Sequence, residues 1–300
     1  PAMTVETLPS PFKGLASFEE SDAAYFFGRE RLVGELAART VGSGLLGVVG
    51  ASGSGTTTLN GNNTFTGGAN INSGIVVAGH ANAFGTAGTV NLNGGELQSG
   101  AALTIGRAFA LNRNFTLGGS NDLTLSGTFT NNSSSNTLTV SNTAATALSG
   151  GVVLSGTLNV AGSGNLAASG VISSTGGLTY AGTGTLTLSN AASTYTGVTK
   201  VSSGTLSVGT LAAGGVASGI GQATTASDRI VLDGGTFKYT GATVSTDRLF
   251  SVGGSGGTLD ASGSGAVTFS NAGAIGFNNT PGTRTLTLAG TNTAANTLKR

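Results

Sequence analysis

A glycine-rich loop near the N-terminus is the first candidate for chemistry. The stretch 50–57 reads GASGSGTT and follows a short apolar run. A phosphate-binding loop consists of glycine, four residues, glycine, lysine and then serine or threonine, placed between a strand and a helix so that backbone N–H groups converge on phosphate oxygens. Gly50, Gly55 and Thr57 fit this spacing, and Gly53 adds flexibility between them. These four residues are the candidate cofactor-binding residues of a vestigial phosphate loop.

The lysine of such a loop is missing. Thr56 stands in its place, and a neutral hydroxyl cannot supply the cation that meets the β- and γ-phosphates. Residues 57–63 are rich in β-branched and turn-forming types and are a poor start for a helix. No strand with an acidic residue to hold a metal ion is recognisable downstream, so the residues needed for nucleotide hydrolysis are missing from this pattern. We therefore expect no ATP, no other cofactor and no catalysis at this loop.

A second candidate is the one cluster of charges in the C-terminal half. Its members are Asp228, Asp233, Asp247, Asp260, Arg229, Lys238 and Arg248. Paired carboxylates could act as acid and base on a polysaccharide. An offset of 19 residues, however, would stack Asp228 over Asp247 and Arg229 over Arg248 in an alternating surface ladder. We favour the ladder and predict no catalytic residue here.

The remaining candidates favour structural roles. His80 is the only histidine and cysteine is absent, so a metal site or a histidine triad has no partners. We expect His80 in a solvated turn and predict no metal. Phe109, Phe115 and Phe129 are expected to stack in the core rather than to form a carbohydrate platform.

The composition excludes several classes of protein. Glycine contributes 53 of 300 residues, charged residues only 8%, and the formal net charge is +1. Such a chain has no field to attract nucleic acid or an anionic membrane. Hydrophobic residues make up 38% and recur regularly, which argues against disorder. No run of 18 apolar residues and no basic start followed by an apolar stretch occurs, so we expect neither a spanning helix nor a signal peptide.

The chain changes character near residue 55. Residues 1–54 carry ten of the 25 charged residues and three of the four prolines. Apolar positions over 30–39 predict a short helix, and 45–49 reads as a short buried strand. We therefore divide the chain into a segment 1–55 with α/β-like character and a second unit, 56–300.

The second unit consists of short strands and turns. Stretches such as 122–127 (DLTLSG) and 184–188 (GTLTL) alternate apolar and hydroxyl residues, and glycine or asparagine separates them. Period two means that one face of each strand is buried. The pattern of 64–79 returns at 194–209, and a shorter echo has an offset of 19. Coils of about 22 residues are typical of a solenoid, and we expect about eleven coils with aliphatic columns inside.

Residues 9–55 resemble the N-terminal edge of STAND-type signalling NTPases. The resemblance rests on PFKGL (11–15), FEE (18–20), DAAYFFGRE (22–30) and the glycine-rich loop. It implies that 26–30 would lie near a nucleotide base and 50–55 near its phosphates. The resemblance stops where the lysine and the following helix should appear.

Residues 56–300 resemble the autotransporter-associated β-strand repeat of bacterial passenger regions. The stretches that carry it are 55–79, 182–209 and 284–297, and the stretch 232–241 has a similar residue pattern. The resemblance implies a parallel β-helix, export across both membranes of a Gram-negative cell, and display on the cell surface, association with the outer membrane, or release. The predicted fold is all-β, a right-handed parallel β-helix with a short α/β-like N-terminal segment.

The function predicted from these features is structural. We expect a surface or secreted adhesin-like scaffold without catalysis, whose outward Thr, Ser and Asn side chains make weak contacts with glycans or proteins of host or cell surfaces. Nucleic acid and membrane insertion are not expected. The alternatives are a nucleotide-binding STAND-type signalling fragment and a β-helix enzyme that cleaves polysaccharide.

Overall fold

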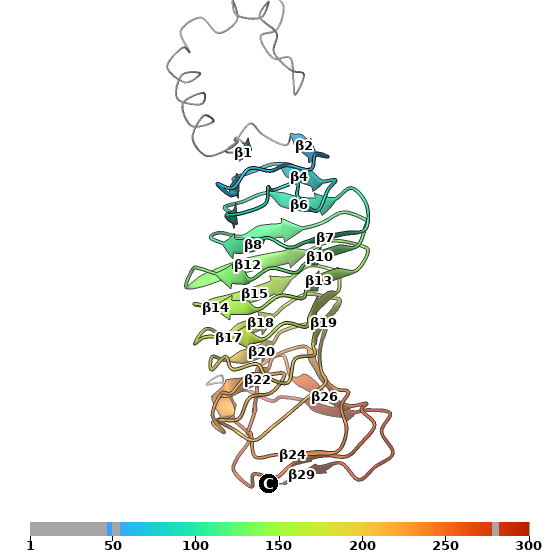
Figure 1. Ribbon diagram of the computed structural model, residues 1–300. Coiled ribbons are helices and arrows are strands. Elements are labelled where there is room, and N and C mark those ends of the chain that lie inside the picture. Colours follow the sequence, from blue (N-terminus) through green and yellow to red (C-terminus); the bar gives the residue numbers. More distant parts are fainter. Residues whose placement is uncertain (1–46, 50–54, 278–281, 300) are drawn as a thin grey trace, which may run out of the picture.

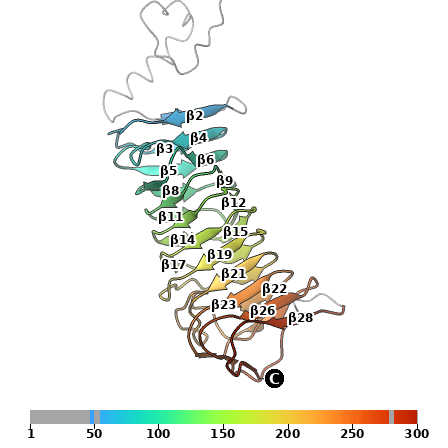
Figure 2. The same ribbon diagram turned by 90° about the vertical axis from the view of Figure 1, so that its right-hand side faces the viewer.

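The described part of the chain is a stack of coils that forms a rod. The computed structural model describes residues 47–49, 55–277 and 282–299. In Figures 1 and 2 the colours run in sequence order from one end of the rod to the other, so each coil lies on the preceding one. Every strand pairing is parallel, for example β15 with β18 and β16 with β19. The predicted all-β parallel β-helix is confirmed, and the described residues contain no α-helix.

Three long sheets and one short sheet form the walls of the rod, and we name them A to D. Sheet A contains β1 (Gly47–Val49), β3 (Ala69–Ile71), β5 (Thr89–Leu92), β8 (Ala108–Leu111), β11 (Phe129–Asn131), β14 (Val152–Leu154) and β17 (Ile172–Ser173). Sheet B contains β2 (Thr56–Leu59), β4 (Ile75–Ala78), β6 (Glu96–Ser99), β9 (Phe115–Leu117), β12 (Ser135–Val140), β15 (Thr157–Ala161), β18 (Leu178–Tyr180), β20 (Thr199–Val201), β22 (Ile230–Leu232) and β25 (Ser251–Val252).

The other two sheets complete the coil. Sheet C contains β7 (Leu103–Ile105), β10 (Leu123–Leu125), β13 (Thr146–Leu148), β16 (Leu166–Ala168), β19 (Thr185–Leu188), β21 (Thr205–Val208), β23 (Thr236–Tyr239), β26 (Gly257–Ala261) and β28 (Leu286–Ala289). Sheet D contains β24 (Val244–Thr246), β27 (Val267–Phe269) and β29 (Thr297–Leu298). A 3-10 turn, η2 (Ser227–Arg229), precedes β22.

The repeat length agrees with the prediction over most of the rod. Val90 pairs with Phe109, Phe109 with Phe129 and Phe129 with Val152, so successive coils are about 20 residues long. Two steps are longer, because Thr199 pairs with Ile230 and Gly257 with Leu286. Sheet B has ten strands, one coil fewer than the eleven expected, since these longer connections consume chain without adding a turn.

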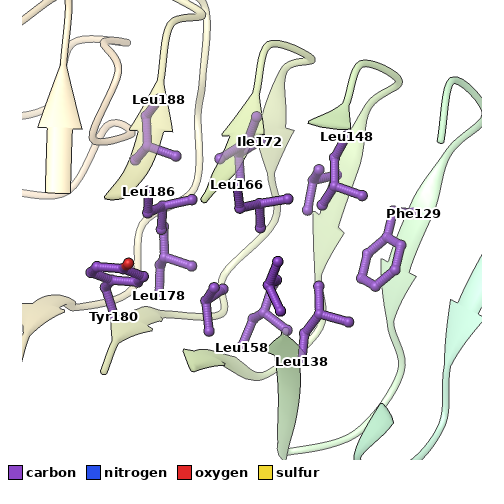
Figure 3. Packing of buried hydrophobic residues seen from close by; sticks show 14 of the residues in the cluster. Phe129, Leu138, Leu148, Leu158, Leu166, Ile172, Leu178, Tyr180, Leu186 and Leu188 are labelled. Atoms are coloured by element: carbon purple, nitrogen blue, oxygen red, sulfur yellow. The ribbon is translucent and has the colours of Figure 1, made fainter. Parts of the chain in front are cut away.

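The core is a set of apolar columns between the walls. Strands such as β10, β18 and β27 alternate buried and half-buried residues along their length, as period two predicts. Figure 3 shows leucines of neighbouring coils directed into the shared interior. Phe109, Phe115 and Phe129 are each at most 2% exposed, which confirms their predicted place in the core. Burial of one such side chain contributes about 1.5–3 kcal/mol.

Stacked glycines let the corners of neighbouring coils approach. A Cβ atom on Gly150 would collide with the carbonyl oxygen of Gly127, and a Cβ atom on Gly170 with that of Gly150. Backbone therefore lies on backbone at this corner over three successive coils, with no room for a side chain. This requirement accounts for part of the high glycine content.

The regular architecture is interrupted in the last third of the rod. Sheet A ends at β17, and sheet D begins only at β24. Between them, the segment 190–198 and an insertion at 209–226 lie without regular strands. The insertion falls inside the long step from Thr205 to Thr236.

One strand of the N-terminal segment belongs to the solenoid. The strand expected over 45–49 is present as β1, and its backbone pairs in parallel with β3. The helix predicted over 30–39 lies outside the described residues. The division at residue 55 stays a prediction.

Candidate functional site

The candidate phosphate loop is described only in its second half. Gly50 and Gly53 lie outside the described residues. Gly55 is exposed, and its carbonyl accepts a hydrogen bond of 3.0 Å from the amide of Ile75. Thr57 lies in the middle of β2, beside Val76 of β4. Gly55 and Thr57 thus take part in a strand pairing, whereas a phosphate loop would lead into a helix there. Their role in cofactor binding stays a prediction.

The charged cluster of the sequence is divided into separate pairs. Lys200 Nζ lies 2.8 Å from Asp233 Oδ2, and Lys238 Nζ lies 3.5 Å from Asp260 Oδ2. Both pairs join neighbouring coils. Each of these carboxylates has a lysine partner within the described part of the chain, which is the arrangement of ion pairs on a surface.

The ionisation of Asp233 argues against a general acid at this position. The hydrogen bond from Lys200 holds the pKa of the Asp233 carboxyl below its usual value, burial opposes this shift, and the amide of Ser255 adds to the lowering. A general acid in glycoside cleavage needs a raised pKa, so that it carries a proton near neutral pH. Asp233 has the opposite shift, and it is better suited to structure than to proton transfer.

The predicted ladder of Asp228 over Asp247 and Arg229 over Arg248 is wrong. Val231 lies beside Ser251, twenty residues further on, rather than at an offset of nineteen. Arg229 ends the 3-10 turn η2, and Arg248 follows β24 outside any strand, so the two arginines do not share a ladder position. Arg229 pairs with its neighbour Asp228 at 3.4 Å on the surface, whereas Arg248 is only 1% exposed.

The buried Arg248 is the charged feature that the sequence did not reveal. Its Nε donates to the carbonyl oxygen of Ala212 at 3.0 Å. Its Nη2 donates to those of Val216 and Gly221, at 3.0 and 2.9 Å. All three acceptors belong to the insertion 209–226. The only available signals were a charge in a chain with few charges and the lengthened step in the repeat.

Tyr195 lies near this cation in the same buried region. Its hydroxyl lies 2.7 Å from Thr199 Oγ1. Burial raises the pKa of Tyr195 to about 12, although the hydrogen bond with Thr199 and the positive charge of Arg248 lower it. In turn, burial lowers the pKa of Arg248, while Tyr195 and Asp247 raise it. At neutral pH the tyrosine is therefore protonated, and the arginine has the positive charge that a guanidinium keeps in proteins.

Polar side chains form regular columns outside the core. Asn91 Nδ2 donates to Asn70 Oδ1 at 2.9 Å, and Asn132 Nδ2 donates to Asn112 Oδ1 at 3.0 Å. On the outer face of sheet C, one column contains threonine in five successive strands. Its members are Thr185, Thr205, Thr236, Thr258 and Thr287. These columns offer hydroxyl and amide groups in a neutral array.

Two hollows lie in the C-terminal part of the described chain. One, of about 290 Å³, lies among apolar residues such as Phe237, Val267 and Phe269. Asp260 borders it but is paired with Lys238. The second, of about 660 Å³, includes Ile275 and Phe277 in its lining. Neither contains a pair of carboxylates, so neither matches the acid and base arrangement of a glycan-cleaving enzyme.

His80 lies half-buried in a turn, where its Nδ1 accepts a hydrogen bond of 3.0 Å from the amide of Asn82. Among the described residues, no group of three His, Cys, Asp or Glu side chains could hold a metal ion. The same part of the chain contains no helix that is long and apolar enough to span a membrane.

Comparison with known proteins supports both resemblances. The family model described as passenger-associated-transport-repeat matches residues 51–78 and 178–208, which correspond to the two copies of the repeat recognised in the sequence. The model described as Novel STAND NTPase 1 matches residues 11–60. The two matches overlap at 51–60, where the structure has the strand β2.

A curated relative shares part of the chain. The adhesin BmaC autotransporter of Brucella suis biovar 1 (strain 1330) is 45% identical over 89 residues, which are 29% of this chain and 3% of that protein. This chain therefore spans a small part of that relative. No solved structure matches the chain. The solenoid thus contains repeats similar to those of autotransporter passengers, and it follows a segment similar to part of a STAND NTPase.

Proposed function

We propose that this chain is a structural, adhesin-like scaffold of the autotransporter passenger type. The observation that carries the proposal is the parallel stack of about ten coils, since two of its stretches match the passenger-associated repeat. Such a stack buries its apolar residues in one continuous core and needs neither a metal nor a disulfide to close. Such a stack provides an extended surface rather than a reactive site.

The proposed location is the surface of a Gram-negative bacterium, or the medium around it. The similarity to the BmaC adhesin and to passenger repeats supports this location. Contacts with glycans or proteins of other cells would use the outward Thr, Ser and Asn side chains. Because these groups are neutral and repeat at regular steps, each contact is weak, and binding gains strength from many contacts together.

The absence of catalysis is also part of the proposal. It is supported by the pairing of Asp233 with Lys200 and of Asp260 with Lys238, and by the ionised state that Lys200 favours for Asp233. A nucleotide-binding function would depend on residues 50–57, where Thr56 stands in the lysine position.

The experiment compares monomeric and multivalent forms of the purified chain. Beads coated with the chain are incubated with cultured epithelial cells, and adhesion is counted against beads coated with albumin. We expect adhesion by coated beads and competition by the soluble chain only at high concentration. Adhesion equal to that of albumin beads would contradict the proposal, and release of reducing sugars from a polysaccharide panel would contradict the absence of catalysis.

A further inference from the structure

The insertion 209–226 replaces regular structure with a packed loop. It lies in the interval between the end of sheet A and the start of sheet D. Few of its hydrogen bonds follow the strand pattern. The amide of Gly215 donates to Ala223 O at 2.9 Å, and the amide of Gly219 donates to Thr210 O at 3.1 Å. The loop therefore closes on itself and leaves carbonyl groups directed toward its centre.

The guanidinium of Arg248 fills that centre. It donates to the carbonyl oxygens of Ala212, Val216 and Gly221 at 2.9–3.0 Å. These acceptors are spread over ten residues of the loop, so one side chain ties three separate points together. With 1% exposure, Nε and Nη2 have exchanged water for these carbonyls, while Nη1 is buried without a hydrogen-bond partner in the described part of the chain. A buried charge is tolerated only where such acceptors are in place.

The residues around Arg248 hold the same loop. Thr246 Oγ1 donates to Ala212 O at 2.8 Å. Asp247 Oδ1 accepts from the amide of Gly214 at 2.7 Å, and the amide of Leu249 donates to Thr225 O at 3.1 Å. Four consecutive residues thus contact the insertion, and Arg248 reaches furthest into it.

We propose that the carbonyl groups of Ala212, Val216 and Gly221 form an internal guanidinium-binding site, occupied by Arg248, which fixes the conformation of the insertion. The shape of the group explains the choice of residue. A planar guanidinium directs its N–H groups outward in one plane and can reach several carbonyls around a ring. Lysine carries a compact ammonium and cannot span the same three acceptors.

The first test uses the unaltered protein. Nitrogen-15 NMR of the arginine side chains at neutral pH should show a slowly exchanging Nε proton for Arg248, because its Nε and Nη2 donors are buried and hydrogen-bonded. Arg229, which is on the surface, is the internal reference, and an Arg248→Lys variant assigns the signal. If the Arg248 protons exchange as fast as those of Arg229, the site does not exist as proposed.

The second test removes the ligand and returns it. In Arg248→Ala, hydrogen exchange of peptides from 209–226 should become at least about tenfold faster, while peptides from β13 to β16 keep their protection. Arg229→Ala is the matched control and should leave the insertion unchanged. Millimolar guanidinium, far below denaturing concentration, should restore protection of the insertion, whereas equal concentrations of urea or sodium chloride should not.

The outcomes are decisive in both directions. Loss of protection confined to the insertion and restored by guanidinium alone supports the site. An insertion that keeps its protection in Arg248→Ala, or that guanidinium fails to protect again, overturns it. If the alanine variant does not fold, the exchange of the Arg248 protons in the unaltered protein decides the question.

Discussion

The interior of the rod is stabilised differently in two regions, the regular coils between β7 and β19 and the irregular region around the insertion. In the regular coils, Leu166, Leu186 and Leu206 form one column through paired strands, and no charge is needed inside. Around 209–226 the strand pattern is lost, and a buried arginine with three carbonyl acceptors takes over. Repetition is stabilised by non-directional apolar contacts, whereas a departure from repetition requires specific hydrogen bonds.

The largest expected effect lies in the regular coils. Leu186 is 1% exposed and lies between Leu166 and Leu206 in its column, so Leu186→Ala should lower the free energy of unfolding by about 2–5 kcal/mol. Urea unfolding followed by circular dichroism measures the change. The matched control is Thr187→Ala on the outer face of the same strand, expected within about 0.5 kcal/mol. Equal effects of the two variants would contradict the inward and outward assignment.

A smaller loss is expected when the cation of the irregular region is removed. Arg248→Met keeps much of the length of the side chain but removes the charged donor from three carbonyls, of which those of Ala212 and Gly221 keep only a hydroxyl donor. We expect destabilisation of about 2–4 kcal/mol in urea unfolding. Arg229, which pairs with Asp228 on the surface, provides the comparison. Arg229→Met should change stability by less than about 1 kcal/mol. A neutral or stabilising Arg248→Met would show that the region does not depend on its charge.

Alkaline pH should weaken the irregular region through Tyr195. Its pKa is about 12 in the folded chain and about 10 when unfolded, so folding favours the protonated form. The contribution is complete below pH 10 and is lost as the pH rises toward 12, by roughly 2–3 kcal/mol in total.

Tyr195→Phe should remove part of this alkaline slope, with a loss of about 1 kcal/mol at neutral pH from the missing hydrogen bond to Thr199. The measurement is urea unfolding between pH 8 and pH 11 for both proteins. Because burial also raises the pKa of Tyr180 and Tyr239, some slope should remain. An identical slope in the variant would exclude Tyr195 as a source.

The smallest effect is expected at the surface pair of Lys200 and Asp233. The lysine lowers the pKa of Asp233, so this contribution is present above the usual carboxyl pKa and is lost as the pH falls through the lowered value. Asp233→Asn should cost at most about 1 kcal/mol at neutral pH, and less in high salt. Unfolding at low and high ionic strength measures this, and a loss of several kcal/mol would place the pair among the buried determinants.

Much of the fold could be predicted from the residues. Alternation at strands such as 123–125 and 185–188 indicated which side chains face inward, and the recurring TFTG and TYTG stretches indicated an internal repeat. The register could not be derived in the same way. The offset of 19 suggested stacked charges, but Val231 lies beside Ser251, because the lengths of the connecting loops, rather than the similarity of short motifs, set which residues lie side by side.

Some features of the candidate sites could be predicted from the sequence, and others could not. Replacement of lysine by Thr56 was visible in the sequence, and so was the lack of a second histidine beside His80. The pairing of Lys200 with Asp233 and the burial of Arg248 were not, because each joins residues from different coils. No local pattern records which carbonyl groups will converge on a distant side chain.

By itself, the sequence indicated the class of fold and the identity of the core, since period-two alternation, internal repeats and the resemblance to passenger repeats all point to a stacked solenoid. Only the tertiary structure decided where the regular stack is interrupted and what stabilises the interruption. The physical reason is that apolar burial is encoded residue by residue along a strand, whereas the three carbonyls that receive Arg248 become neighbours only after the loop has closed around it.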